Sequence, residues 1–278
     1  MSRAPASSRL DKALVDRGLA RSREEAERLI AEGSVRVNGA VAEKGARQVK
    51  RADAILVASG GASYVGRGAY KLIGALDELG IDVSGLQACD LGSSTGGFTQ
   101  VLLERGVASV LAIDVGRQQM SERVARDPRV RLLEGVNARH LRRGEADLGH
   151  LDLVVGDLSF ISLTLLAEVV ARELLEGQGA FLLLVKPQFE VDRKVASKGR
   201  GVVRDPSAWT GALHSVIGAF LGLGARIEAV VPSRMRGASG NQEFFVLGRF
   251  GATGTPKDAP EPEEMVARAV ERASAGAL

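Results

Sequence analysis

A glycine-rich turn is the part of this sequence best suited to chemistry. Residues 90–100 read Asp-Leu-Gly-Ser-Ser-Thr-Gly-Gly-Phe-Thr-Gln, and a short apolar run at 86–89 precedes them. Apolar side chains at helical spacing follow from Phe98 to Leu103, so the glycines lie between a strand and a helix. Glycine is required where a ligand lies against the backbone and a Cβ atom would be in the way. This turn is therefore a candidate nucleotide-binding site.

An acid after the next strand fits the sugar of such a nucleotide. The strand expected at 110–113 ends in Asp114, which is placed to accept hydrogen bonds from both ribose hydroxyls. A NAD-type turn reads Gly-x-Gly-x-x-Gly, whereas here Gly92 is followed by Ser-Ser-Thr and preceded by Asp90. A carboxylate beside the turn repels a pyrophosphate but attracts a sulfonium or an ammonium group, so we expect S-adenosylmethionine rather than NAD. The residues expected to bind it are Asp90, Gly92, Ser93, Ser94, Gly96, Gly97, Phe98, Asp114, Val115, Asn137 and Asp157.

Four charged side chains form a second candidate group. Asp157 and Lys186 each follow an apolar strand, and open α/β sheets bind ligands at the carboxyl ends of their strands. Lys71 lies in the helix before the sheet, and Glu243 opens the last strand. A lysine next to a buried strand is costly to bury without an acidic partner. Each residue alone is equally consistent with a solvated structural charge, so the interpretation depends on the whole set.

The composition is that of an ordinary soluble protein of 278 residues, with 45% hydrophobic and 26% charged side chains. A single cysteine excludes a disulfide framework and predicts a reducing cytoplasm. Three scattered histidines give no cluster of metal ligands, so we expect no metal. The first residues lack the apolar core of a signal peptide, and no run approaches the ~18 apolar residues of a membrane helix. We therefore expect no membrane partner.

Positive charge is concentrated in the N-terminal segment. The whole chain carries a formal charge of +3, but residues 1–60 hold twelve Lys and Arg against eight Asp and Glu, which is +4. This segment therefore predicts a polyanionic partner, although an ordinary solvated face is the alternative. Its expected elements are two short helices, capped by Ser8 and by a capping box from Ser22 to Glu25, and a hairpin at 35–39. The basic residues expected to contact the partner are Arg9, Lys12, Arg21, Arg23, Arg28 and Arg36.

Alternating strands and helices fill the rest of the chain. Strands are expected at 86–89, 110–113, 130–133, 151–156, 180–185, 226–231 and 243–250. A short loop joins the last two, which predicts a seven-stranded, mainly parallel sheet with one antiparallel strand inserted at the end. After residue 250 the chain is rich in Pro, Gly and acids, and a helix is expected at 265–273. This tail is expected to be disordered or to dock as a single helix.

These motifs resemble known families. Residues 8–60, with Arg-Leu-Asp, Ser-Arg-x-x-Ala and Val-Asn-Gly, resemble the S4 RNA-binding module. The four charged residues are similar to the Lys-Asp-Lys-Glu tetrad of FtsJ-type ribose 2′-O-methyltransferases. Together with the S4-like start, the chain most resembles the TlyA family, also called haemolysin A-type rRNA methyltransferases. The matching segments are 90–98, 157–162, 185–190, 201–206 and 239–245, whereas 116–120 departs from the family's Gly-Tyr-Gly-Gln-Leu.

The resemblance implies a Rossmann-like class I methyltransferase fold preceded by a small α+β RNA-binding domain. The implied parts are an S4-like domain at 8–60, a linker at 61–67, a methyltransferase domain at 68–250 and a tail at 251–278. The implied activity is methyl transfer from S-adenosylmethionine to a cytidine 2′-hydroxyl in ribosomal RNA, 23S and in some members also 16S. Ribosomal RNA or ribosomal subunits in the cytoplasm are the implied partners, and a monomer is favoured over an oligomer.

The resemblance also implies roles for the tetrad. Lys186 is the expected base for the weakly acidic 2′-hydroxyl, because burial and repulsion from Lys71 favour its neutral form. Asp157 and Glu243 are expected to orient the lysines and to balance their charge. Further RNA contacts are expected from Arg67, Arg200, Arg204, Arg234 and Arg236.

Other activities stand as alternatives. A non-catalytic RNA-binding assembly factor would keep the fold but has no need of the tetrad, and a membrane-active haemolysin is suggested only by the family's second name. Base N-methylation commonly uses an Asn/Asp-Pro-Pro-Tyr/Phe loop, and the Asp-Leu-Ser-Phe at 157–160 lacks its prolines. Methylation at C5 of cytosine needs a thiolate, and Cys89 is expected to lie in the core.

Overall fold

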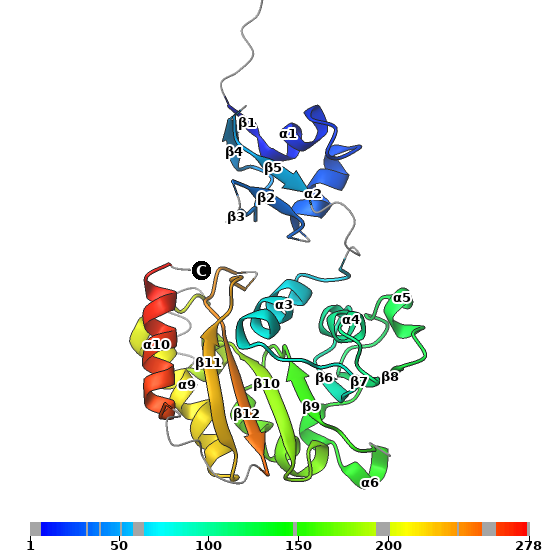
Figure 1. The fold of residues 1–278 in the computed structure, drawn as a ribbon, viewed down its shortest axis with the longest axis vertical. Helices are drawn as coiled ribbons and strands as arrows, with labels where there is room; N and C mark the ends of the chain where they lie inside the picture. Colours follow the sequence, from blue (N-terminus) through cyan, green and yellow to red (C-terminus); the bar gives the residue numbers. More distant parts are fainter. Residues whose placement is uncertain are drawn as a thin grey trace, which may run out of the picture. The chain divides into compact units, whose positions relative to one another are not determined.

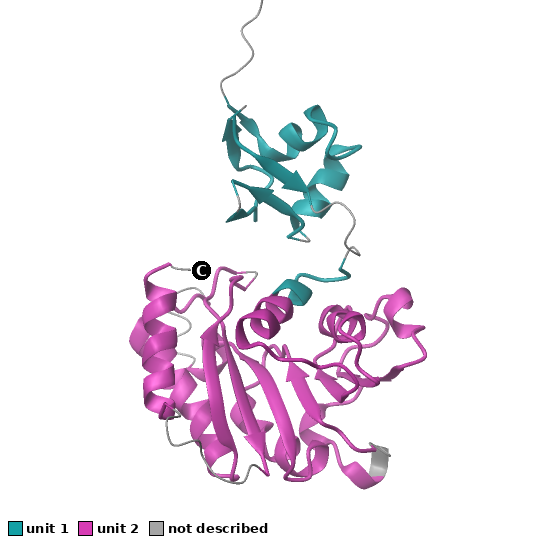
Figure 2. Ribbon diagram, viewed as in Figure 1, with its two compact units in different colours: residues 1–70 teal, residues 71–278 magenta. Residues whose placement is uncertain are grey.

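The chain divides into two compact units, Met1–Tyr70 and Lys71–Leu278 (Figure 2). The computed structural model describes residues 7–31, 33–38, 40–50, 52–57, 64–146, 149–192, 201–237, 239–251 and 260–276. The division falls inside helix α3 (Gly68–Leu79). The linker expected at 61–67 falls entirely within the bounds of unit 1, and its first three residues lie outside the described residues.

Unit 1 is a small α+β module. Its elements are β1 (Ser7–Arg9), α1 (Leu10–Asp16), α2 (Arg23–Ala31), β2 (Val35–Val37), β3 (Ala40–Val41), β4 (Gln48–Lys50) and β5 (Ile55–Val57) (Figure 1). Strand β1 pairs with β4, and β2 lies between β3 and β5, all antiparallel. Leu10 and Leu14 of α1 meet Ala26 and Ile30 of α2 in one apolar cluster. The predicted helix pair and hairpin are therefore confirmed.

The two helix starts in unit 1 differ from each other. Ser8 does not cap a helix, because it lies in β1 opposite Val49, and α1 begins at Leu10 without a side-chain cap. The prediction for Ser8 was wrong because strand pairing at this segment outweighs its capping preference. At α2 the Glu25 N–H donates to Ser22 Oγ (3.1 Å), as the capping box predicts.

Unit 2 is built on a seven-stranded sheet in the order β11-β12-β10-β9-β6-β7-β8 (Figure 1). The strands are β6 (Gln87–Leu91), β7 (Ser109–Asp114), β8 (Val130–Glu134), β9 (Leu153–Gly156), β10 (Gly179–Val185), β11 (Arg226–Pro232) and β12 (Phe244–Phe250). Strand β12 runs antiparallel to both of its neighbours, and the pairs among β10, β9, β6, β7 and β8 are parallel. All seven predicted strands and the predicted sheet class are confirmed.

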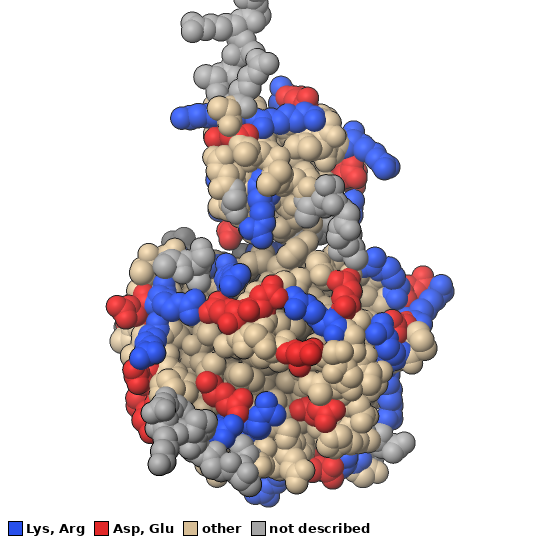
Figure 3. Space-filling model, viewed as in Figure 1, with Lys and Arg blue, Asp and Glu red and all other residues tan. Residues whose placement is uncertain are grey.

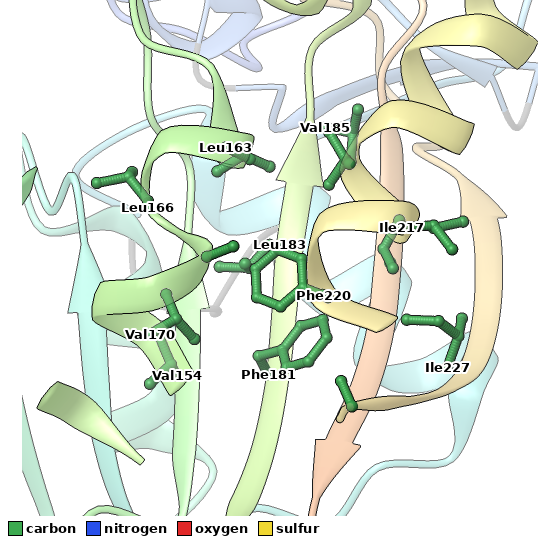
Figure 4. Packing of buried hydrophobic residues seen from close by; sticks show 14 of the residues in the cluster. Val154, Leu163, Leu166, Val170, Phe181, Leu183, Val185, Ile217, Phe220 and Ile227 are labelled. Carbon is green, nitrogen blue, oxygen red and sulfur yellow. The ribbon is translucent and has the colours of Figure 1, made fainter. Parts of the chain in front are cut away.

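Helices join these strands and cover the sheet. They are α3, α4 (Gly97–Glu104), α5 (Glu122–Ala125), α6 (Arg143–Ala146), α7 (Pro187–Glu190), α9 (Pro206–Leu221) and α10 (Pro262–Ser274), with 3-10 turns η1 (Ala138–His140) and η2 (Leu163–Leu165) and the π-helix η3 (Val169–Leu174). Phe181 of β10 stacks on Phe220 of α9, with ring centroids 4.3 Å apart, at the centre of the core on one face (Figure 4). Cys89 lies in the same core, as predicted.

The C-terminal helix α10 packs against β11 and α9. Its buried side chains recur at helical spacing and are Met265, Val266, Ala269, Val270 and Ala273. The helix expected at 265–273 is thus confirmed in its docked form, while 252–259 lie outside the described residues. No helix in the described part of the chain is long and apolar enough to span a membrane.

Candidate active site

The glycine turn connects β6 to α4 through left-handed backbone. Gly92 has φ 79° and Gly96 has φ 92°, values that side chains rarely adopt. The Gly96 N–H donates to the Ser93 carbonyl (2.7 Å), which closes the turn. A Cβ atom at Gly92 would lie 3.1 Å from the backbone oxygen of Asp157. The turn therefore packs directly on the end of β9, beside the predicted tetrad.

Asp90 is completely buried rather than exposed beside the turn. Its Oδ2 accepts hydrogen bonds from the Thr99 N–H (2.9 Å) and hydroxyl (2.6 Å), whereas its Oδ1 has no partner among the described residues. Burial raises the pKa of Asp90 to about 7, against the two Thr99 bonds, which lower it. The Ser93 hydroxyl is also buried and has no hydrogen-bond partner in the described part of the chain. These two unsatisfied oxygens fit a ligand that brings hydrogen-bond donors or positive charge.

Asp114 is used partly by the protein itself. Its Oδ2 accepts from the Ser94 N–H (2.8 Å) and its Oδ1 from the Gly116 N–H (2.6 Å). A carboxylate has about four lone-pair positions, so both oxygens can still accept from a ribose. Val115 is 71% exposed, and Asn137 is exposed and accepts from the Arg139 N–H. The predicted ribose contact remains a prediction.

The four residues of the predicted tetrad lie together. Lys71 Nζ is 2.7 Å from Glu243 Oε2 and 3.5 Å from Asp157 Oδ2. Lys186 Nζ is 2.6 Å from Asp157 Oδ1. They form a chain of alternating charge whose side chains are only 3–18% exposed. Two ammonium groups and two carboxylates balance each other, which is how a protein can bury four charges at one place.

Glu243, the acid at the end of this series of alternating charges, lies in a tight space. A Cβ atom at Gly237 would lie 2.5 Å from Glu243 Oε1, so the absence of a side chain there leaves room for the carboxylate. Burial raises the pKa of Glu243, and the attraction of Lys71 opposes that shift. Lys71 therefore stabilises the ionised form of an acid that the protein interior disfavours.

Three residues near the tetrad were not predicted as parts of the site. Lys186 Nζ donates to Ser159 Oγ (2.8 Å), which gives this ammonium group a second partner. Phe160 has φ 64° and is 91% exposed, and its ring centroid lies 5.1 Å from that of Phe189. A large apolar ring held on the surface in left-handed backbone is unusual enough to indicate function. The sequence contains these residues in its motifs but gives no sign of their exposure.

A buried asparagine fixes the loop beside the site. Asn241 is 2% exposed, its Oδ1 accepts from the Val203 N–H (2.9 Å), and its Nδ2 donates to the Gly201 carbonyl (2.8 Å). Trp209 donates to the Val203 carbonyl (2.9 Å) and is buried, as predicted. The segment 201–203 is therefore clamped from both sides.

The predicted RNA-contacting arginines of unit 1 fall into two groups. Arg9 and Arg23 bind the fully buried Asp11, at 2.7 and 3.1 Å, so these two arginines serve the module's own structure. Arg21 is exposed. Lys12 and Arg28 are more than half exposed and pair with acids of their own helices. Arg36 is exposed on β2.

In unit 2 the predicted arginines also differ in their surroundings. Arg204, Arg234 and Arg236 are all exposed, and Arg234 also lies 3.5 Å from Glu78 of α3. Arg67, which belongs to unit 1, is half-buried, and Arg200 lies outside the described residues.

A basic segment of unit 2 was missed. Residues 115–143 hold eight Arg against three Asp and Glu, which is +5, more than the +3 of the whole chain. Figure 3 shows Lys and Arg gathered at the edge where Figure 1 places α5 and β8. Counting charge over 115–143, rather than over the N-terminal segment alone, would have found it.

The described part of the chain holds no group of three or more His, Cys, Asp or Glu that could bind a metal.

The model of FtsJ-like methyltransferases matches residues 64–250, and that of the S4 domain matches residues 8–55. S-adenosylmethionine is the methyl donor of such methyltransferases, and the two unsatisfied buried oxygens at the glycine turn fit its cationic groups.

Known proteins resemble the chain over most of its length. The 16S/23S rRNA (cytidine-2′-O)-methyltransferase TlyA of Mycobacterium tuberculosis is 45% identical over 241 residues, which cover 86% of this chain and 88% of that protein. A solved structure from Streptococcus thermophilus, provisionally named a hemolysin, has 30% identity and a TM-score of 0.71, and covers 99% of each chain. A Listeria monocytogenes structure provisionally named an S-adenosylmethionine-dependent methyltransferase shares the fold, at 14% identity and a TM-score of 0.51, over 66% of this chain and 99% of that one. The chain therefore belongs to the TlyA family of FtsJ-like methyltransferases with an N-terminal S4 domain.

Proposed function

We propose that this protein methylates the 2′-hydroxyl of a cytidine in ribosomal RNA. The observation that carries the proposal is the alternating chain of Lys186, Asp157, Lys71 and Glu243 beside the glycine turn. The relative from M. tuberculosis bears the name of that activity on 16S and 23S rRNA.

The site residues have distinct tasks in the proposed reaction. Asp90, Asp114 and the glycine turn would hold S-adenosylmethionine, whose sulfonium centre would give up its methyl group and leave as a thioether. The ammonium of Lys186 lies between Asp157 and Ser159, and loss of one proton makes it a base for the 2′-hydroxyl. Asp157 contacts both lysines and so fixes their separation. Positioning of this kind contributes on the order of 7–11 kcal/mol to lowering a barrier.

Phe160 fits the handling of the target base. A 2′-hydroxyl inside a folded RNA is reached more easily when its nucleotide is unstacked, and an unstacked base binds to aromatic faces. Phe160 offers an exposed ring one residue after Ser159, which contacts Lys186. We therefore assign Phe160 and its neighbour Phe189 to stacking of the cytosine.

The two parts of the chain divide the work in this proposal. The S4-like part at 8–60 binds structured RNA, the segment 61–67 links the parts, and the methyltransferase part at 68–250 carries the chemistry. The exposed Arg21 and Arg36 of unit 1 and the exposed Arg204 and Arg236 of unit 2 are the proposed phosphate contacts. The cytoplasm, where ribosomal RNA is found, is the proposed location.

A transfer assay tests the proposal. The protein is incubated with methyl-labelled S-adenosylmethionine and with unmodified 30S subunits, 50S subunits or naked rRNA. A 2′-O-methyl group protects the adjacent phosphodiester from alkaline hydrolysis, so the labelled nucleotide should be recovered as an alkali-resistant dinucleotide with cytidine at its 5′ side. Binding of RNA without transfer, or label on a base, would contradict the proposal, and the three substrates show which particle is modified.

A further inference from the structure

One stripe of helix α3 carries a charged residue near each end. Lys71, Gly74 and Glu78 are spaced by three and four residues, so they lie along one stripe of the helix. At the start of this stripe Lys71 binds Glu243 and Asp157. The rest of the stripe belongs to no function described above.

Two arginines bind the end of this stripe. Glu78 is 17% exposed, and its Oε1 lies 2.7 Å from Arg272 Nη1 of α10, an ionic contact without hydrogen-bond alignment. Its Oε2 lies 3.5 Å from Arg234 Nε. A Cβ atom at Gly74 would be 3.2 Å from Arg234 Cδ, so the stem of Arg234 lies across this glycine. Glu78 thus connects α3 to α10 and to the connection between β11 and β12.

The two anchors are themselves fixed. Helix α10 holds five buried side chains against β11 and α9, which makes it a rigid support for Arg272. Arg234 lies in the same connection as Glu243, and the Ser233 N–H donates to the Glu243 carbonyl (2.8 Å). The helix of Lys71 and the connection that carries Glu243 are therefore attached to each other through Arg234, and the helix of Lys71 is also attached to α10 through Arg272.

We propose that Arg272 and Glu78 are positioning residues, through which the C-terminal helix α10 sets the place of Lys71 in the active site. The inference rests on the proposed function, because Lys71 matters only if the tetrad carries the reaction. Helix α10 lies beyond residue 250, where the match to the FtsJ-like methyltransferase model ends. Arg234, predicted above to bind RNA, has an internal role in this account.

Single-turnover kinetics of the full chain test the inference. Arg272→Ala and Glu78→Gln should each slow methyl transfer about tenfold or more, because small displacements of a catalytic group cost that much. The dissociation constants for S-adenosylmethionine, by calorimetry, and for RNA should stay at their original values, and Arg272→Lys should restore most of the rate. Arg268→Ala is the matched control, since Arg268 lies one turn earlier on α10 and, among the described residues, forms its ion pair within that helix, with Glu264; it should transfer methyl at the original rate.

Each other result contradicts the inference. Original rates in both Arg272→Ala and Glu78→Gln would show that the contact does not position Lys71. Loss of cofactor and RNA binding in step with the rate would show a general structural role. Absence of transfer by the unchanged protein would instead refute the proposed function, and the inference with it.

Discussion

Among the described residues, each unit buries one aspartate completely, and the two aspartates have opposite surroundings. Asp11 in unit 1 accepts hydrogen bonds from the guanidinium groups of Arg9 and Arg23, and these hold the pKa of Asp11 well below its usual range. Asp90 in unit 2 accepts two bonds, both from Thr99, and burial raises its pKa to about 7. Identical side chains with the same exposure thus have opposite preferences for the proton.

The difference separates an acid that stabilises the fold from an acid that is prepared for a ligand. Asp11 has its charge compensated within the module, so nothing remains for it to bind. Asp90 keeps one oxygen without a partner and lies at the start of the glycine turn. A buried group with an unmet need for positive charge destabilises the free protein and is relieved when a cation binds. Burial alone therefore does not tell the two roles apart, whereas the partners do.

The largest expected effect is on the pH dependence conferred by Asp90. Because its pKa is raised in the folded protein, Asp90 contributes stability at low pH that is lost as the pH rises through about 7. Asp90→Asn removes this loss. From pH 5 to pH 8 the free energy of unfolding of the free protein should therefore fall by about 3 kcal/mol relative to that of the variant.

Urea denaturation at several pH values, with the fluorescence of Trp209 as the probe, measures this difference. The same variant should bind S-adenosylmethionine more weakly by calorimetry. Parallel stability curves for the two proteins would contradict the raised pKa of Asp90. Unchanged affinity for the cofactor would contradict a role of Asp90 in the cofactor site.

The same substitution in unit 1 should have the opposite sign at neutral pH. Asp11→Asn removes the negative charge that accepts hydrogen bonds from the guanidinium groups of Arg9 and Arg23. Since both arginines are about half exposed, the expected loss is about 2 kcal/mol rather than the full cost of breaking a buried pair. The stability due to Asp11 is present above the usual aspartate pKa and is lost in strong acid. Hydrogen exchange of the amides in α1 and α2 measures it. Asp16→Asn, at an exposed acid of the same helix, is the control, and equal protection in all three proteins would contradict the account.

Much of the fold was predictable because its signals are local. Most strands of unit 2 contain an apolar run ended by a glycine or a charge, and the seven strands appear in the structure within a few residues of their predicted bounds. The placement of Asp157 and Lys186 followed from the rule that strands of an open sheet present their carboxyl ends at one place. Lys71 and Glu243 joined them through the resemblance to the FtsJ-type tetrad, and the structure brings all four together.

The rest depends on contacts that no local pattern contains. Ser8 was expected at a helix start, but its pairing with Val49 depends on a strand forty residues away. Arg234 was predicted to contact RNA, and the packing of its stem on Gly74 could not be predicted from the loop sequence. The exposure of Phe160 is equally invisible, because a phenylalanine in an apolar motif is normally buried.

The smallest expected effects concern the basic residues of the two units. If both units contact RNA phosphates, Arg21→Gln in unit 1 and Arg139→Gln in the segment 115–143 should each reduce the dependence of log Kd on log salt by about 0.7–1. Filter binding of unmodified rRNA from low to physiological salt measures the slope. Arg268→Gln on α10 is the control and should leave it unchanged. An effect of Arg21 alone would assign RNA binding to unit 1 and not to the basic segment of unit 2.

The central claim is that the buried tetrad performs the methyl transfer, and Lys186→Ala tests it most directly. Transfer from labelled S-adenosylmethionine to unmodified rRNA is followed in a single turnover, while calorimetry reports binding of the cofactor to the same protein. The account predicts that transfer is abolished and that the cofactor still binds. Transfer at a near-original rate by Lys186→Ala would contradict it.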